Sequence, residues 1–255
     1  MEFRQPTETE TILKRLPSVA MEFNGRYIEN ELNGYETLKV SGRETIGVEL
    51  ISELTHEGVV TIDERLPHRE LTITYELQAD NNTEFQERFK TLRKLLTINE
   101  QVPIKFLDEP DTFYFGRLSA METVPDDSNI IISTFTIHCD SPYKFSDLVT
   151  TDGSVMIDTF YPTLPEQITL TIGSTTNKIE ITNGSERITA TGTFNAGSEV
   201  VIKFKKEEVI MTVNGVEATY MIDLQSDLEN FLLKEGQTVT STQGTIELKV
   251  RERWL

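Results

Sequence analysis

The fold of this chain is decided by residues 66–118, which read LPHRELTITYELQADNNTEFQERFKTLRKLLTINEQVPIKFLDEPDTFYFGRL. Apolar and polar side chains alternate strictly from Leu71 to Leu77, which is the period-2 pattern of a half-buried strand. A helix is predicted over residues 83–97, because its apolar side chains recur at helical spacing and form one stripe. They are Phe85, Phe89, Leu92 and Leu96. The stretch predicts an antiparallel sheet with one helix packed on one face.

The boundaries of this helix and the elements after it also follow from the pattern. Thr83 and Gln86 have the spacing of a capping box, so we expect the helix to begin at Thr83. Residues 102–106 alternate again as a strand, and the turn 108–111 leads to the aromatic strand 113–115. Local turn chemistry explains the acidic residues of that turn without a bound ion.

The second half of the chain consists of short alternating runs between residues 168 and 250, spaced about every 8–12 residues. Asn183-Gly184 and Asn214-Gly215 have the composition of two-residue hairpin turns. Residues 216–220 are expected to continue as a strand, and residues 226–233 as a helical turn across one end. About seven short strands with such turns predict a β-sandwich.

A length of 255 residues suits two domains of about 100–150 residues each. Residues 1–20 are expected to be a polar N-terminal extension. We expect an N-terminal β domain over 21–148 and a C-terminal β-sandwich over 149–255, because residues 150–154 have linker composition. The predicted fold class is therefore mainly β, in two domains, with one packed helix in the first.

Composition restricts the classes of function. The chain has 42 acidic and 24 basic residues, and its formal net charge is −18. Such a balance argues against binding to a phosphate backbone, which needs clustered Lys and Arg. No apolar run approaches the length of a membrane helix, and the N-terminus lacks the apolar core of a signal peptide. We therefore expect no membrane partner and synthesis as a soluble chain in a cytoplasm.

The residue types that carry catalysis or metal binding are few and scattered. The single cysteine, Cys139, excludes an intramolecular disulfide and is expected to be a buried, inert thiol. Three histidines, His56, His68 and His138, lie in different segments, and His138 faces away from its neighbour Cys139 on a strand. No phosphate-binding glycine loop, calcium loop or nucleophile elbow occurs. We expect no catalytic site, no cofactor and no metal site, so the chain is not expected to be an enzyme.

Several short motifs, taken in order along residues 21–255, carry a family resemblance. They are Met21–Gly25, Val40–Arg43, Leu66–Ile73, the helix Phe85–Leu96, Asp108–Asp111, Ser141–Lys144 and the segment Ile222–Gly236. In this order and spacing they resemble the distal tail (Dit) proteins of long-tailed, non-contractile bacteriophages, the siphophages. Residues 1–20 precede the usual start of that family, and the second half has no room for the inserted carbohydrate-binding modules of enlarged relatives.

The resemblance implies a structural role in the virion, at the phage tail tip. Family members form a homo-hexameric ring from their N-terminal domains, with galectin-like β-sandwich C-terminal domains outside. The ring joins the tail-tube protein to the tail-associated hub protein and often anchors receptor-binding or baseplate proteins. DNA only passes through its lumen, and we expect acidic residues to line that channel.

The loop-rich segment 44–65 is the most plausible ring contact, because long loops in compact domains are usually functional. Its β-branched run 59–62 is typical of one arm of a hairpin or an extended flap. The candidate interface residues are His56, Glu57, Gly58, Val59, Val60, Arg65 and Leu66.

Two other classes of function stay open. One is a carbohydrate-binding host adhesin that acts through the C-terminal β-sandwich. The other is a hydrolase of the host envelope, which the lack of a catalytic constellation disfavours.

Overall fold

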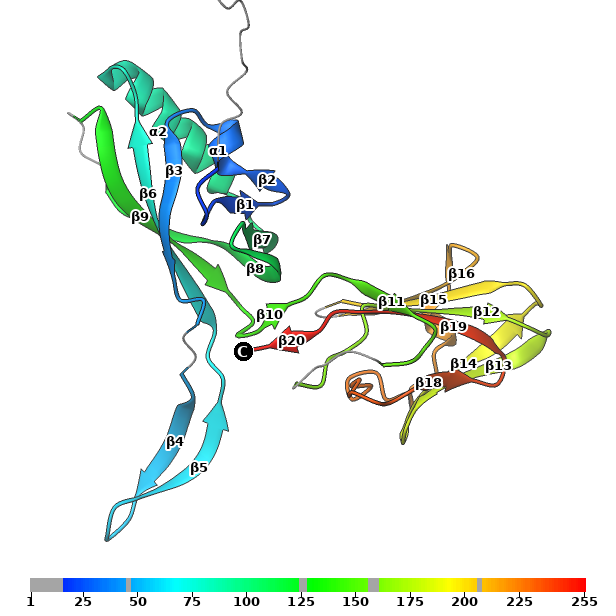
Figure 1. Ribbon diagram of the computed structural model, residues 1–255. Coiled ribbons are helices and arrows are strands. Elements are labelled where there is room, and N and C mark those ends of the chain that lie inside the picture. Colours follow the sequence, from blue (N-terminus) through cyan, green and yellow to red (C-terminus); the bar gives the residue numbers. More distant parts are fainter. Residues whose placement is uncertain (1–15, 45–46, 124–127, 156–160, 206–207) are drawn as a thin grey trace, which may run out of the picture. The chain divides into compact units, whose positions relative to one another are not determined.

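The computed structural model describes residues 16–44, 47–123, 128–155, 161–205 and 208–255 (Figure 1). Residues 1–15 of the expected N-terminal extension lie outside the described residues. The chain divides into two compact units. The first contains the chain up to Pro110 together with Phe115–Ser141, and the second contains Asp111–Tyr114 and Pro142–Leu255. The domain limits inferred from sequence remain a prediction.

Within the described residues, the first unit contains an antiparallel sheet, a separate two-stranded hairpin and two helices. Its elements are β1 (Met21–Phe23), β2 (Arg26–Tyr27), α1 (Ile28–Glu31), β3 (Tyr35–Ser41), β4 (Glu49–Leu54), β5 (Val59–Arg65), β6 (Arg69–Gln78), α2 (Asn82–Leu96), β7 (Val102–Phe106), β8 (Glu109–Met121) and β9 (Ile130–Cys139). The main sheet has the order β2-β1-β7-β8-β9-β6-β3, and β4 pairs only with β5 (Figure 1).

Strand β6 lies inside this sheet between β9 and β3, and it carries the alternation expected from the sequence. Leu71, Ile73, Tyr75 and Leu77 are buried, whereas the residues between them are exposed or half-buried. The ring of Tyr75 stacks on Tyr35 of β3, with a centroid distance of 5.6 Å. It also contacts Phe135 of β9 at 5.5 Å. The core of the first unit is therefore built outward from β6.

Helix α2 buries Phe85, Leu92 and Leu96, three of the four residues of the predicted stripe. Its start differs from the expectation, because the N-cap is Asn81 and not Thr83. The Asn81 side chain accepts a hydrogen bond from the Glu84 backbone N–H at 2.9 Å. Glu84 in turn accepts one from the Asp80 backbone N–H at 3.2 Å. The bond from the Glu84 amide to the Asn81 side chain caps the helix. It is favourable because the first backbone N–H groups of a helix have no acceptor within the helix.

The second unit is a β-sandwich. Its elements are β10 (Lys144–Phe145), β11 (Val149–Thr151), β12 (Gln167–Ile172), β13 (Thr176–Asn183), β14 (Glu186–Phe194), β15 (Glu199–Phe204), β16 (Val209–Val213), β17 (Val216–Glu217), the 3₁₀ helix η1 (Thr219–Met221), β18 (Val239–Ser241), β19 (Gly244–Val250) and β20 (Arg253–Trp254). One sheet has the order β11-β19-β12-β15-β16-β17 and the other β14-β13-β18. Both contribute to one buried cluster that includes Leu170, Ile181 and Phe231. The predicted fold class, mainly β with antiparallel sheets, is confirmed.

One local expectation in the second unit is confirmed and three need correction. Asn214 and Gly215 both have positive φ, as predicted for a two-residue turn. The other hairpin turns one residue later than expected, because buried Asn183 still pairs with Glu186. Residues 216–220 are not one strand, since β17 ends at Glu217 and η1 follows. Residues 226–233 contain hydrogen-bonded turns and no helix.

Helix α1 was not expected. It has only four residues, which is too short for a periodic pattern. Among the described residues, no helix is long and apolar enough to span a membrane.

Replacing the helix cap tests the assignment of Asn81. The substitution Asn81→Ala should lower the free energy of unfolding by about 1 kcal/mol, because it leaves the Glu84 amide without its partner. Thr83→Ala is the matched control and should change stability by less than about 0.5 kcal/mol. Urea unfolding followed by circular dichroism measures both. A larger loss for Thr83→Ala than for Asn81→Ala would contradict the assignment.

Candidate interaction surface

Strands β4 and β5 form a two-stranded antiparallel hairpin within residues 49–65. The Thr55 backbone N–H donates to the Gly58 carbonyl at 3.0 Å and closes the turn. Gly58 has a φ of +93°, a conformation that favours glycine. The register shifts by one residue between Ile51 and Ser52, which marks a β-bulge. The expectation of a hairpin arm in this segment is confirmed, and residues 45–46 of the segment lie outside the description.

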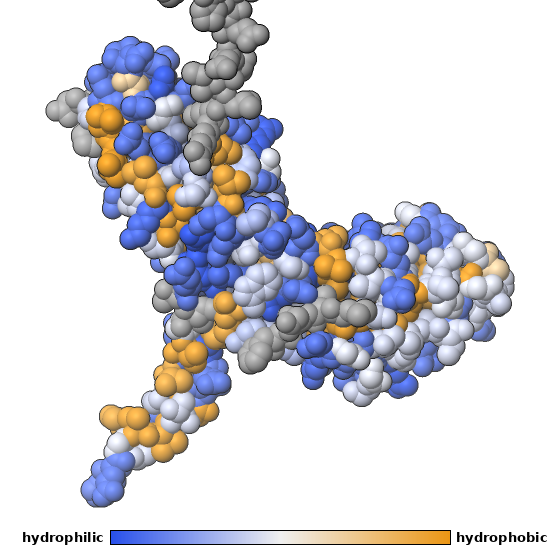
Figure 2. Space-filling view, in the orientation of Figure 1, coloured by the Kyte–Doolittle hydropathy of each residue, from blue (hydrophilic) through white to orange (hydrophobic). Residues whose placement is uncertain are grey.

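Every residue of both strands is exposed, including six large apolar side chains. Their exposed fractions are Leu50 59%, Ile51 48%, Leu54 88%, Val59 61%, Val60 55% and Ile62 58%. Figure 2 shows the resulting apolar surface along the hairpin. No described residue of the chain covers either face. Exposed apolar side chains on both faces of a hairpin are a candidate interaction surface, and an isolated two-stranded ribbon is only marginally stable in water.

All seven interface residues proposed from sequence lie on this hairpin or directly after it. His56, Glu57 and Gly58 form the exposed bend, Val59 and Val60 begin β5, Arg65 ends it, and Leu66 is half-buried just beyond. Sequence reasoning missed the apolar residues of the other arm, Leu50, Ile51 and Leu54. Their apolar character was visible, but their pairing with β5 was not.

The two segments that flank the hairpin, Gly42-Arg43 before it and Arg69 after it, form its root. Hydrogen bonds from the buried Arg69 side chain join them. Arg69, at the start of β6, is 3% exposed. Its Nη1 donates to the Gly42 carbonyl at 2.8 Å and to the Arg43 carbonyl at 2.6 Å. Gly42 has a φ of +94°, and a Cβ there would meet the Glu70 carbonyl oxygen at 1.9 Å. The chain therefore enters the hairpin segment and leaves it at one fixed place.

A second arginine joins this root to the turn before β8. Arg43 donates to both carboxylate oxygens of Asp108, at 2.8 and 2.9 Å. These hydrogen bonds are the main reason why the pKa of Asp108 is lowered. The Arg43 guanidinium also lies 5.2 Å from the centre of the Phe106 ring. Turn chemistry alone therefore does not account for Asp108, and that interpretation of the sequence was incomplete.

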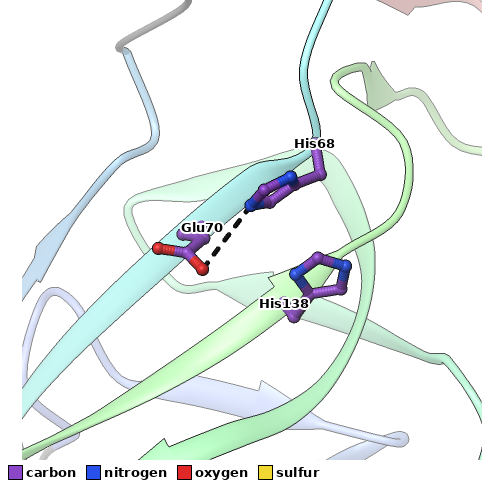
Figure 3. A group of neighbouring side chains, drawn as sticks. All are labelled: His68, Glu70 and His138. Atoms are coloured by element: carbon purple, nitrogen blue, oxygen red, sulfur yellow. Dashed lines mark ion pairs between the residues drawn. The ribbon is translucent and has the colours of Figure 1, made fainter.

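Two of the three histidines meet on the exposed face of the sheet (Figure 3). The rings of His68 and His138 are 4.5 Å apart, and His68 Nε2 lies 3.6 Å from Glu70 Oε1. Glu70 and His138 are direct neighbours in the β6–β9 register. Sequence reasoning treated these histidines as scattered. The signal that it lacked is the register between β6 and β9.

Cys139 lies on the opposite, buried face of β9 and is 2% exposed. Burial raises the pKa of its thiol to about 12, and nearby Arg69 opposes the shift only in part. A protonated and inaccessible thiol is a poor nucleophile. The expectation of a buried cysteine is confirmed.

Comparisons with known proteins agree in both halves of the chain. Residues 25–141 match the phage tail protein RIFT-related domain, and residues 159–254 match the C-terminal domain of the siphovirus-type tail component. The distal tail protein of Bacillus phage SPP1 is 27% identical in an alignment 221 residues long, which covers 80% of this chain and 85% of that protein.

Solved structures show the same fold. The crystal structure of SPP1 Dit, described as a paradigm of the hub adsorption apparatus in phages that infect Gram-positive bacteria, aligns with a TM-score of 0.78 and 24% identity. The alignment covers 92% of this chain and 99% of that one. A chain of the phage p2 baseplate in its activated conformation with Sr aligns with a TM-score of 0.55 at 9% identity, over 86% of this chain and 91% of its own length.

The role of Arg69 can be tested by removing its guanidinium. Arg69→Met keeps much of the aliphatic stem but leaves two carbonyls without their donor, so the free energy of unfolding should fall by about 2–3 kcal/mol. Arg65→Met removes only the exposed ion pair with Glu49 and should cost less than about 1 kcal/mol. Urea unfolding compares the two variants. Equal effects would mean that the buried arginine does not fix the root.

Burial of Cys139 predicts its reactivity. The thiol should react with an aromatic disulfide reagent at pH 8 at least about 100-fold more slowly in the folded chain than in urea, since it is protonated and covered. Absorbance at the wavelength of the released thiolate follows the reaction. Equal rates in the two conditions would contradict the structure.

Proposed function

The chain belongs to the distal tail protein (Dit) family of siphovirus tail components, and from this premise we propose that it forms a hexameric hub at the phage tail tip. The observation that carries the proposal is the match of two tail-protein domains in order, on a fold shared with SPP1 Dit over 92% of the chain. The chain is a structural component of the phage tail. Six copies of the 29.1 kDa chain would give a ring of about 175 kDa.

The β4–β5 hairpin is the proposed contact between neighbouring copies in this ring. Its apolar side chains are uncovered in the single chain, and burial of apolar surface is the main driving force for association. Its outer strand edges can also pair with a neighbour, which would remove surfaces prone to aggregation. In this arrangement residues 21–148 form the ring, and residues 149–255 lie outside it as the C-terminal β-sandwich.

The mechanism of such a hub is geometric. The ring would join the tail-tube protein to the tail-associated hub protein and offer its outer face to receptor-binding or baseplate proteins. A net charge of −18 suits a lumen through which DNA passes, because like charges do not bind. Synthesis in the host cytoplasm and incorporation into the virion tail complete the proposal.

Two substitutions on the hairpin test the ring contact. Val59→Asp with Val60→Asp places a charge on each face of β5 and should prevent ring formation, because burying an unpaired carboxylate is costly. Leu224→Asp is the control, since Leu224 is fully exposed in the second unit and outside the hairpin. Native mass spectrometry and negative-stain imaging should show rings for the unchanged chain and for Leu224→Asp, and monomers for the double variant.

Partners must be included if the purified chain is monomeric. Addition of the tail-tube or hub protein should then produce the ring from the unchanged chain but not from the double variant. A chain that stays monomeric with both partners and instead binds to a glycan array would overturn the hub proposal in favour of the carbohydrate-binding adhesin.

A further inference from the structure

We propose that His68, Glu70 and His138 bind a divalent transition-metal ion of the Zn²⁺ class. His68 directly precedes β6, Glu70 is its second residue, and His138 lies near the end of β9; the three side chains come together on the same exposed face (Figure 3). Nothing in the proposed hub role uses them, and the inference does not depend on ring formation.

The geometry is close to that of a metal site. Among the described residues, these are the one group of three His, Cys, Asp or Glu side chains in which one ligand atom from each lies within 4.8 Å of the other two. Ligands at about 2.0–2.1 Å in a tetrahedral zinc site are about 3.3–3.5 Å apart. The separation of His68 Nε2 and Glu70 Oε1 is already 3.6 Å. Small side-chain rotations would bring the other ligand atoms to the same separation. They are possible because the side chains of His68 and Glu70 are half or more exposed.

The ligand chemistry selects the class of metal. Two imidazole nitrogens and one carboxylate suit Zn²⁺, Co²⁺, Ni²⁺ or Cu²⁺, whereas Ca²⁺ and Mg²⁺ prefer sets made only of oxygen. His₂Glu is a known three-residue zinc set with an open fourth position for water. The two imidazole nitrogens make this distinction, and the carboxylate of Glu70 adds a third ligand and a negative charge.

The surroundings supply one supporting and one opposing charge. Asp140 Oδ1 lies 3.4 Å from His138 Nε2, and a carboxylate beside a metal-binding imidazole orients the ring and raises its basicity. Arg117 of β8 is the neighbour of His138 on its other side. Its positive charge opposes a cation, but two carboxylates, Glu70 and Asp140, outweigh it.

A bound ion would connect the chain just after the hairpin to the end of β9. His68 lies three residues after β5, beside the buried Arg69 that holds the hairpin root. The ion would therefore add a second, reversible link at the same root, on the wet face of the sheet. Such a link stabilises the folded state, because the metal binds the folded chain and not the unfolded one.

Metal titration of the full-length chain, free of any histidine tag, tests the proposal. Calorimetry with Zn²⁺ should show one site per chain, and Co²⁺ should give the visible absorption bands of a nitrogen–oxygen site. His68→Ala, His138→Ala and Glu70→Gln should each weaken Zn²⁺ binding at least 10-fold. The matched controls, Glu76→Gln on the same strand and His56→Gln at the remaining histidine, should bind as the unchanged chain does.

Thermal unfolding gives an independent readout. Zn²⁺ should raise the melting temperature of the unchanged chain and of both controls, but not that of the three site variants, and 1 mM Ca²⁺ should not compete. Absence of a saturable Zn²⁺ site in the unchanged chain would overturn the proposal. Unchanged affinity in the His68 and His138 variants, or loss of binding in the His56 variant, would overturn it as well.

Discussion

The rest of the first unit depends on one buried cation, the guanidinium of Arg69. It lies at the start of strand β6 and donates hydrogen bonds to the carbonyls of Gly42 and Arg43, which directly follow β3. A buried charge is tolerated only where hydrogen bonds satisfy it, so these carbonyls cannot move away without a large cost. Arg43 then reaches Asp108 with its own side chain. Three segments far apart in the sequence are thereby held together at one place, and two of them flank the hairpin along the chain.

The hydrogen bonds of Arg69 and Arg43 connect three of the motifs that carry the family resemblance, although these motifs are far apart in the sequence. Val40–Arg43, Leu66–Ile73 and Asp108–Asp111 are separate in sequence, but each supplies one part of the same cluster of hydrogen bonds. The rest of the fold requires apolar side chains at buried positions but not particular residues. A phage p2 baseplate chain aligns at only 9% identity, so what the two chains share is mostly the arrangement of elements. Burial on one face of a strand requires apolar character, whereas the cluster requires particular side chains.

The sequence predicted the elements that bury a regular face and missed the contacts between distant segments. Alternation from Leu71 to Leu77 and the stripe of α2 were readable because burial imposes a period. The cap of α2 was ambiguous in the sequence, since Thr83 with Gln86 and Asn81 with Glu84 have the same spacing, and the structure uses the second pair. The bonds of Arg43 to Asp108 and the approach of His68 to His138 depend on strand register, which local patterns do not contain.

The exposed hairpin has a consequence for the chain before it meets any partner. Freshly made subunits carry an uncovered apolar ribbon, which favours non-specific clustering, and a formal charge of −18, which opposes it. The two effects have different ranges: repulsion acts over about 10 Å at moderate ionic strength, whereas apolar contact requires touching surfaces. The surplus of acidic residues therefore opposes the approach of two chains before their apolar ribbons can touch.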